Sequence, residues 1–316
     1  MWKYTLERII LIFFTAFIIL SVTYLLMKLL PVSSPAGQVS DQLRFYQQQV
    51  NLGYMEVIPY NLKDTAQITL LDPQTGKEYY FSYKPVLEQY GSWIYNIFTQ
   101  WNWGVSSSIA PGQDIMSIIA VRLPYSIKIN IYATLIDVPV GFGLGIWAAV
   151  KKNKLTDSII STLVMIFISV PSFVLVSFLI SLFGYQLKWL PTTWPSDSTS
   201  DVGTKVLGYV IPVATLALGS VASFTRYTRA ELTEVMSNDF MVLARTKGLT
   251  KGQAIVHHAL RNSGVVLFPM VIGEFISILS GSMILEQIYS IPGIVTLFVQ
   301  AIQAKDYNVI MVDMAI

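Results

Sequence analysis

Five apolar segments, each close to 20 residues or longer, constrain the fold of this 316-residue chain more than any other feature. They cover residues 9–30, 127–150, 159–183, 206–224 and 265–288. A helix needs about 20 mostly apolar residues to cross a bilayer, so each segment is predicted to be a membrane-spanning helix. A further apolar run begins near Tyr307 and reaches Ile316. At about 1.5 Å per residue it is too short to span. We therefore predict an all-α integral membrane protein.

Composition agrees with this prediction. Hydrophobic residues make up 53% of the chain and charged residues only 13%, which is about half the charged share of a soluble domain. A net charge of +2 is too small to indicate nucleic-acid binding. The chain has no cysteine, which excludes disulfides and thiolate metal sites, and its two histidines, His257 and His258, lie outside the predicted spans. We predict neither a metal site nor a cofactor.

Lysine and arginine in the short loops orient the spans, because cytoplasmic loops carry an excess of these residues. Basic residues gather before the first span, between the second and third, and between the fourth and fifth. All three places, and with them the N-terminus, are predicted to face the cytoplasm. The chain then divides into a first transmembrane helix (residues 1–30), an extracytoplasmic subdomain (31–118) and a transmembrane core (119–316).

The polar loop at residues 229–262 has helix signals of its own. Asn238 precedes Asp239 at a predicted helix start, where a side-chain oxygen can accept hydrogen bonds from free backbone N–H groups. Phe240, Leu243 and Ala244 then fall on one face at helical spacing. A short helix held outside the bilayer between two spans indicates a contact for a cytosolic partner.

The end of this short helix is also marked. Lys247 and Gly248 are predicted to close it, because a cation suits a helix C-terminus and glycine tolerates a left-handed cap. A second short helix is predicted at residues 253–260, after the turn at residues 250–252.

At these residues the chain resembles the permease subunits of ABC importers, in the branch that takes up peptides or nickel. The loop of that branch typically reads ARAKGLS and HALRNA, and this chain has ARTKGLT from Ala244 and HALRN from His258. The wider family pattern is Glu-Ala-Ala, three residues, Gly, nine residues, then Ile-x-Leu-Pro. Gly248 matches its glycine and Ala244 its second alanine, whereas Val242, Leu243 and Arg261 depart from it in the manner of the peptide branch. The resemblance covers roughly residues 100–310 and includes residues 122–124 and, after the fifth span, Glu286, Pro292 and Gly293.

The resemblance implies a six-span permease bundle in a bacterial cell membrane, with the end of the sixth span missing from this sequence. It also implies a homologous second permease subunit, two cytosolic ATP-binding subunits and an extracytoplasmic substrate-binding protein. Peptide import would follow alternating access, driven through the short cytosolic helix. The residues expected to couple it to the ATPases are Asp239, Phe240, Leu243, Ala244, Arg245, Lys247, Gly248 and Leu249.

The predicted extracytoplasmic subdomain carries a β-hairpin signal. Apolar and aromatic residues alternate on both sides of residues 72–76, which predicts a hairpin with a five-residue turn within a small subdomain. Two interpretations of this subdomain stay open: a docking surface for the binding protein, and a solvated cap over the pore mouth. Trp93, Trp101 and Trp103 near its end are interpreted as an interfacial aromatic belt.

Two acids, Asp137 and Glu274, sit near the middle of the second and fifth spans. An ionised group at the bilayer centre costs about 2.5–3.5 kcal/mol on insertion scales, so such groups face a bundle interior or a water-filled cavity. Two interpretations are open: a pair in the substrate pathway that meets a positive amino terminus, and protonated or hydrogen-bonded acids at helix contacts. Glu286, near the end of the fifth span, is interpreted as a structural residue that caps a helix or packs near the gate.

Small and helix-breaking residues interrupt the apolar segments. Gly141, Gly143 and Gly145 lie within an apolar helix with no preceding strand, so they indicate close helix packing and not a dinucleotide site. Pro139 and Pro171, together with Pro212, are predicted to kink their helices.

No phosphate-binding loop or catalytic set of side chains is evident, so the chain is not predicted to be an enzyme. Three alternatives to a peptide permease remain. A nickel or small-solute permease belongs to the same family, although no histidine lies in the spans. A secondary transporter would need no ATPase, and it leaves the loop pattern unexplained. A membrane receptor would act through its outer segment.

Overall fold

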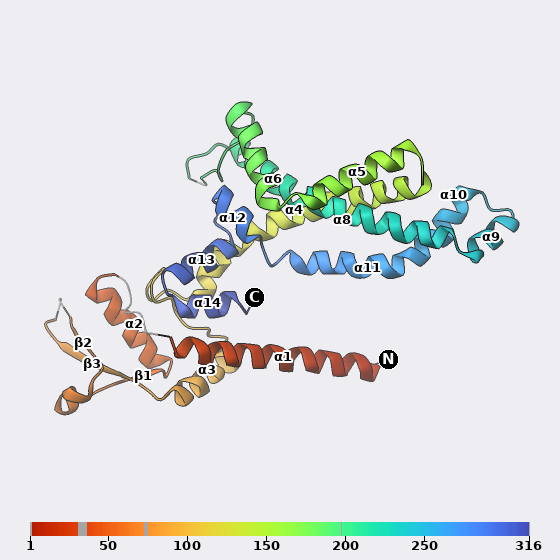
Figure 1. Cartoon of the computed structure of the whole chain (residues 1–316). Helices are drawn as coiled ribbons and strands as arrows, with labels where there is room; N and C mark the ends of the chain where they lie inside the picture. Colours follow the sequence, from red (N-terminus) through yellow and green to blue (C-terminus); the bar gives the residue numbers. More distant parts are fainter. Residues whose placement is uncertain (1, 31–36, 73–74, 197, 316) are drawn as a thin grey trace. The chain divides into compact units, whose positions relative to one another are not determined.

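The computed structural model describes residues 2–30, 37–72, 75–196 and 198–315. The chain divides into two compact units, residues 1–122 with 297–316 and residues 123–296 (Figure 1). Among the described residues, four helices are long and apolar enough to cross a membrane, and two bent helix pairs would raise that number to six. The helical membrane architecture predicted from the apolar segments is therefore confirmed.

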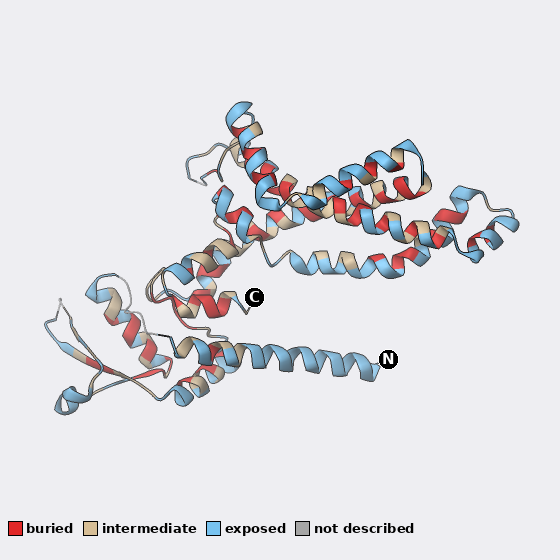
Figure 2. Cartoon of the chain, viewed as in Figure 1, coloured by how far each residue is buried: buried red, intermediate tan, exposed pale blue. Residues whose placement is uncertain are grey.

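The first unit begins with α1 (Trp2–Lys28), in which only Tyr24 is buried within this chain. Its apolar side chains are exposed along its length (Figure 2). A helix that is apolar all round and exposed over most of its length within its own chain suits a lipid or protein environment. α1 corresponds to the predicted first span.

A three-stranded sheet follows, flanked by α2 (Val39–Asn51) and α3 (Val86–Gln100). The hairpin of β2 (Ile68–Leu71) and β3 (Glu78–Tyr83) confirms the alternation signal. Pro73 and Gln74 of its predicted turn lie outside the described residues. The third strand, β1 (Met55–Val57), pairs antiparallel with the other edge of β3, and a short 3₁₀ helix (Tyr60–Thr65) joins β1 to β2. A strand of three residues is too short to show an alternation pattern.

Aromatic side chains build the core of this unit. The rings of Tyr46 and Phe81 stack between α2 and β3, and Trp93 stacks on Tyr24 of α1. Trp93 is only 3% exposed and packs in the core, so its assignment to an interfacial belt was wrong. Trp101 is exposed, as an interfacial residue would be.

The C-terminal part of the first unit is tied down by one carboxylate. Asp306 is fully buried and precedes α14 (Tyr307–Asp313). Its Oδ2 accepts hydrogen bonds from the Ser106 hydroxyl and from the backbone N–H groups of residues 107, 108 and 109. This cradle of N–H groups fixes the loop before α4 against the start of α14.

The second unit is all helical. It contains most of α4 (Ile115–Val150), α5 (Leu155–Ser169), α6 (Ser172–Leu179) with a π-helical end (Ile180–Gln186), α7 (Val202–Gly208) and α8 (Val210–Met236). After the polar loop come α11 (Leu260–Ser277), α12 (Met283–Tyr289) and α13 (Ile294–Gln303). α4 and α13 both continue across the boundary between the two units.

The structure corrects two of the predicted spans and one predicted short helix. The third is bent by 100° between α5 and α6, where Pro171 interrupts the helix. The fifth is a straight helix only to Ser277, and α12 beyond it forms a bent pair with α13. The predicted second short helix is not separate, because residues 251–277 run as one helix through a π-helical turn (Ile255–Ala259) into α11.

Two glycines bring α4 and α8 into close contact. A Cβ atom on Gly141 would lie 2.5 Å from Cβ of Phe224, and one on Gly145 would lie 2.5 Å from Cβ of Thr228. Gly143 has nothing within 4 Å of its Cβ position. The packing prediction is therefore confirmed for the two glycines that share a helix face. The Thr225 hydroxyl donates to the carbonyl oxygen of Gly141 at 3.2 Å and adds a polar link to the contact.

Candidate functional site

The short helix of the polar loop is present as α9 (Asp239–Thr246). Asn238 occupies the N-cap position with an extended backbone, although its side chain makes no capping hydrogen bond. Lys247 is the C-cap, and Gly248 follows it with φ +92°, a left-handed conformation that glycine adopts without strain. The predicted start and end of this helix are both confirmed.

α9 buries one face against the rest of the second unit. Met241 and Ala244 are 6% and 5% exposed and belong to one apolar cluster with Leu232 of α8 and Ile255 of the π-helical turn. Leu249 lies partly buried against the same cluster. Ala244 therefore lies on the packed face of α9, within the interior of this chain.

The other face of α9 is uncovered in this chain. Phe240 and Leu243 are 36% and 56% exposed, and Arg245 and Lys247 are also exposed. The prediction placed Phe240, Leu243 and Ala244 on one face, but the structure separates the buried alanine from the two exposed residues. An apolar pair with two cations beside it is a surface that a partner protein can cover.

A bidentate ion pair fixes the base of this loop. Arg229, near the end of α8, donates through Nε and Nη2 to the two carboxylate oxygens of Asp157 in the first turn of α5. The Asp157 side chain is 4% exposed and that of Arg229 33%. Asp157 also accepts from the backbone N–H of Asn153 at 2.9 Å. Sequence analysis missed this pair, because 72 residues separate its members.

The two mid-span acids come together across three helices of the second unit. Asp137 on α4 is fully buried, and its carboxyl interacts electrostatically with that of Glu274 on α11. The Ser220 hydroxyl on α8 donates to Glu274 Oε1 at 3.3 Å. Neither carboxylate oxygen of Asp137 has a hydrogen-bond partner of ordinary geometry among the described residues. The two acids are therefore neighbours, and Ser220 is a polar residue of this cluster that sequence analysis did not identify.

Glu286 is a structural residue, as predicted. It is 2% exposed, accepts from the Ser126 hydroxyl at 2.6 Å, and accepts from the backbone N–H of Thr296 in the first turn of α13 at 2.9 Å. A Cβ atom on Gly293 would lie 2.4–2.5 Å from its carboxyl group. The glycine therefore leaves room for an acid that caps α13.

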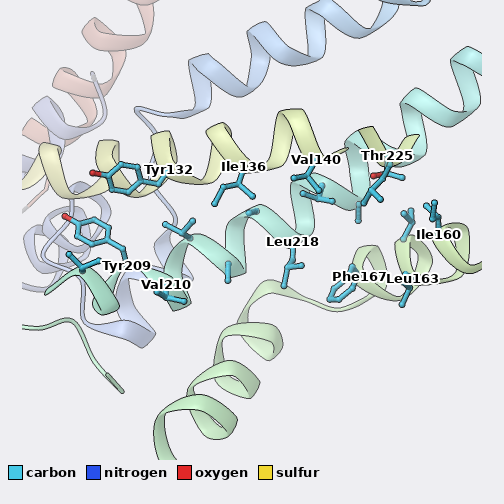
Figure 3. Close-up of a pocket in the computed structure, with 18 residues that line it drawn as sticks. Tyr132, Ile136, Val140, Ile160, Leu163, Phe167, Tyr209, Val210, Leu218 and Thr225 are labelled. Carbon is cyan, nitrogen blue, oxygen red and sulfur yellow. The ribbon is translucent and has the colours of Figure 1, made fainter. Parts of the chain in front are cut away.

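An apolar cavity of about 800 Å³ lies among α4, α5 and α8. Figure 3 shows Ile136 and Val140 of α4, with Phe167 of α5 and Leu218 of α8, among its lining side chains. Its lining contains no charged residue. Such a wall suits acyl chains or another apolar helix, and it offers nothing to hold a charged solute.

Comparison with known proteins identifies the family. Residues 141–316 match the model of the binding-protein-dependent transport system inner membrane component. The chain belongs to this family. The match includes the polar loop, α9, Asp157 and Glu274, whereas Asp137 lies four residues before it. Membership makes the chain a membrane-embedded permease subunit, of a kind that works in general with an ATP-binding subunit and a substrate-binding partner.

Curated relatives cover nearly all of the permease. It is 31% identical to the dipeptide transport system permease protein DppB of Lactococcus lactis over 98% of this chain and 90% of that protein. The DppB protein of Bacillus subtilis is 32% identical over 98% and 89%. The oligopeptide transport system permease protein OppB of Salmonella typhimurium is 28% identical over 98% and 90%. A solved chain of the inward-facing MetNI methionine ABC transporter aligns with a TM-score of 0.46 and 14% identity, over 64% of this chain and 91% of that chain.

Proposed function

We propose that this chain forms part of the translocation pathway of an ATP-driven peptide importer, and that α9 couples it to the ATPases. The observation that carries the proposal is the division of α9 into a face packed in a cluster with α8 and the π-helical turn and an exposed apolar face beside two cations. The names of the relatives support peptides as the substrate class. The complete importer would contain a second permease subunit, two ATP-binding subunits and an extracytoplasmic binding protein.

In this proposal the N-terminus and the polar loop face the cytoplasm of a bacterial cell, and the subdomain of α2, α3 and the sheet lies outside. ATP binding draws the two ATPases together and carries α9 with them. Because α9 shares an apolar cluster with α8 and with the π-helical turn that leads into α11, the membrane helices follow, and the pathway changes its open side. Phe240 and Leu243 would seat α9 in a cleft of the ATPase, and Arg245 and Lys247 would orient it.

The test compares two exposed apolar residues of the polar loop. Leu243 on α9 is 56% exposed and Val256 on the following π-helical turn is 61% exposed, so serine at either site should leave folding intact. We expect Leu243→Ser to reduce both peptide transport and peptide-stimulated ATP hydrolysis by about tenfold or more in the reconstituted importer. Val256→Ser should behave as wild type. Equal activity of the two variants would refute coupling through α9.

We further propose that Asp137 and Glu274 meet the positive amino terminus of the peptide. A charge pair in a partly dry pore is worth more than the same pair in water. Asp137→Asn and Glu274→Gln should insert normally and lower the transport of peptides with free amino termini, with less effect on acetylated peptides. Equal loss for both kinds of peptide would assign the acids to helix packing. Wild-type transport in both variants would remove them from the pathway.

A further inference from the structure

A second cavity, of about 520 Å³, lies within the first unit. Its walls come from the C-terminal end of α1, from α2, from the junction of β3 with α3, and from the start of α14. The volume falls within the range of small-molecule sites. Unlike the apolar cavity of the second unit, this one has lysine and glutamine side chains in its wall.

Lysines give the cavity a positive character. Lys28 lies with its ammonium 5.4 Å from the ring centre of Tyr24 and 5.3 Å from that of Tyr54, and Lys84 also lines the cavity. No Asp or Glu is among the lining residues, and neither lysine forms an ion pair within the described part of the chain. A partly buried ammonium without an anion is costly, and contact with aromatic rings offsets only part of that cost. The cavity is therefore suited to a negatively charged group.

Two buried glutamines add a free donor and a free acceptor. Gln49 of α2 and Gln89 of α3 are 5% and 4% exposed, and both line the cavity. Within the described residues, Gln49 Nε2 and Gln89 Oε1 have no hydrogen-bond partner. The side-chain nitrogen of Gln89, Nε2, donates to the backbone carbonyl oxygen of Lys84 at 2.7 Å, and this hydrogen bond fixes the orientation of the Gln89 side chain. Buried polar atoms are rarely left unpaired, so these two indicate a missing ligand.

We infer that this cavity binds the C-terminal residue of a short peptide. The carboxylate would pair with Lys28, the preceding carbonyl would accept from Gln49, and the amide N–H would donate to Gln89. Phe45, Val86 and Met311 supply an apolar wall for the side chain. A phospholipid phosphate would satisfy the lysine but would bring no amide N–H to Gln89. This inference rests on the proposed peptide substrate and adds a site for the end opposite to the amino terminus.

The experiment uses the full chain in phosphatidylcholine nanodiscs and a tripeptide with a fluorescent label on its amino terminus. The label removes the positive charge, so the mid-span acids do not contribute. Loss of a charge-assisted contact should make the C-terminal amide bind about tenfold more weakly than the free acid. Lys28→Gln should abolish this preference. Lys63→Gln is the matched control, because Lys63 also lies over a tyrosine ring, at 5.0 Å, but does not line the cavity.

Gln89→Leu supplies a second variant that keeps the lysine. It should weaken the tripeptide but leave unchanged the binding of a labelled fatty acid, which has a carboxylate and no amide. Equal binding of the free acid and the amide to wild type would overturn the inference. The inference would also be overturned if phosphatidylglycerol co-purified with wild type but not with Lys28→Gln and blocked binding of the tripeptide. If the reconstituted importer moves peptides while the acid preference is absent, only this inference fails. If it moves no peptide, the proposed function fails.

Discussion

Substitution of Gly145 by alanine tests the closest helix contact in the second unit. A methyl group there would lie 2.5 Å from Cβ of Thr228 and 2.9 Å from the carbonyl oxygen of Thr225. Both threonines are almost fully buried, at 0% and 1% exposure, so neither can move aside freely. Overpacking of this kind costs about 1–3 kcal/mol. The higher helix propensity of alanine offsets about 1 kcal/mol of this steric cost.

Gly143→Ala is the matched control, because that position lies in the same helix with nothing within 4 Å. Both variants gain the same helix propensity, so the difference between them isolates the steric cost of about 1–3 kcal/mol. In domains of 150–250 residues each kcal/mol shifts Tm by about 2–4 °C. We therefore expect Gly145→Ala to melt several degrees below Gly143→Ala in detergent, as measured by tryptophan fluorescence. Equal melting temperatures would show that α4 and α8 are not in this contact.

Three further predictions concern stability and orientation. Asp157→Asn should lower the free energy of unfolding by about 1–3 kcal/mol. This cost lies between those of losing an exposed and a buried ion pair, because Arg229 is one-third exposed. A melting temperature equal to that of wild type would show that the pair is not formed. Gly293→Ala should cost about 1–3 kcal/mol in the same assay, since its methyl group meets a buried carboxyl. Because the chain has no cysteine, Gln47→Cys should react with an impermeant thiol reagent on intact cells and Lys152→Cys should not; the reverse labelling would invert the proposed topology.

Apolar runs and alternation in the sequence correctly predicted those helices and strands that depend on residues close together in the chain. The apolar run of α1 and the alternation in β2 and β3 each follow from residues close in sequence, and both were found where the sequence placed them. Pro171 predicted a break in the third span. The angle of 100° between the two halves depends on what α5 and α6 pack against. Sequence alone does not contain that information.

The assignment of faces on α9 shows a different limit. Residues 240–243 are four consecutive apolar side chains, so apolar character is present on both sides of the helix. Periodicity cannot then tell which side is buried, and Met241 proved to be the packed residue while Leu243 is exposed. The Asp157–Arg229 ion pair could not be predicted for another reason. Nothing in the local sequence around two distant charged residues indicates that they are in contact.

The contacts around α8 explain how a displacement of α9 can reach the middle of the membrane. α8 runs without a break from Val210 to Met236, and its end shares one apolar cluster with α9 and the π-helical turn that leads into α11. Arg229 ties it to α5, and the contacts at Gly141 and Gly145 tie it to α4. Asp137 lies one turn before Gly141 on α4 and interacts with Glu274, which also accepts from Ser220 of α8. The acids therefore sit on the helices that the base of the polar loop holds together. Motion of α11 relative to α8 would change their separation, whereas motion of α4 relative to α8 is resisted by close packing.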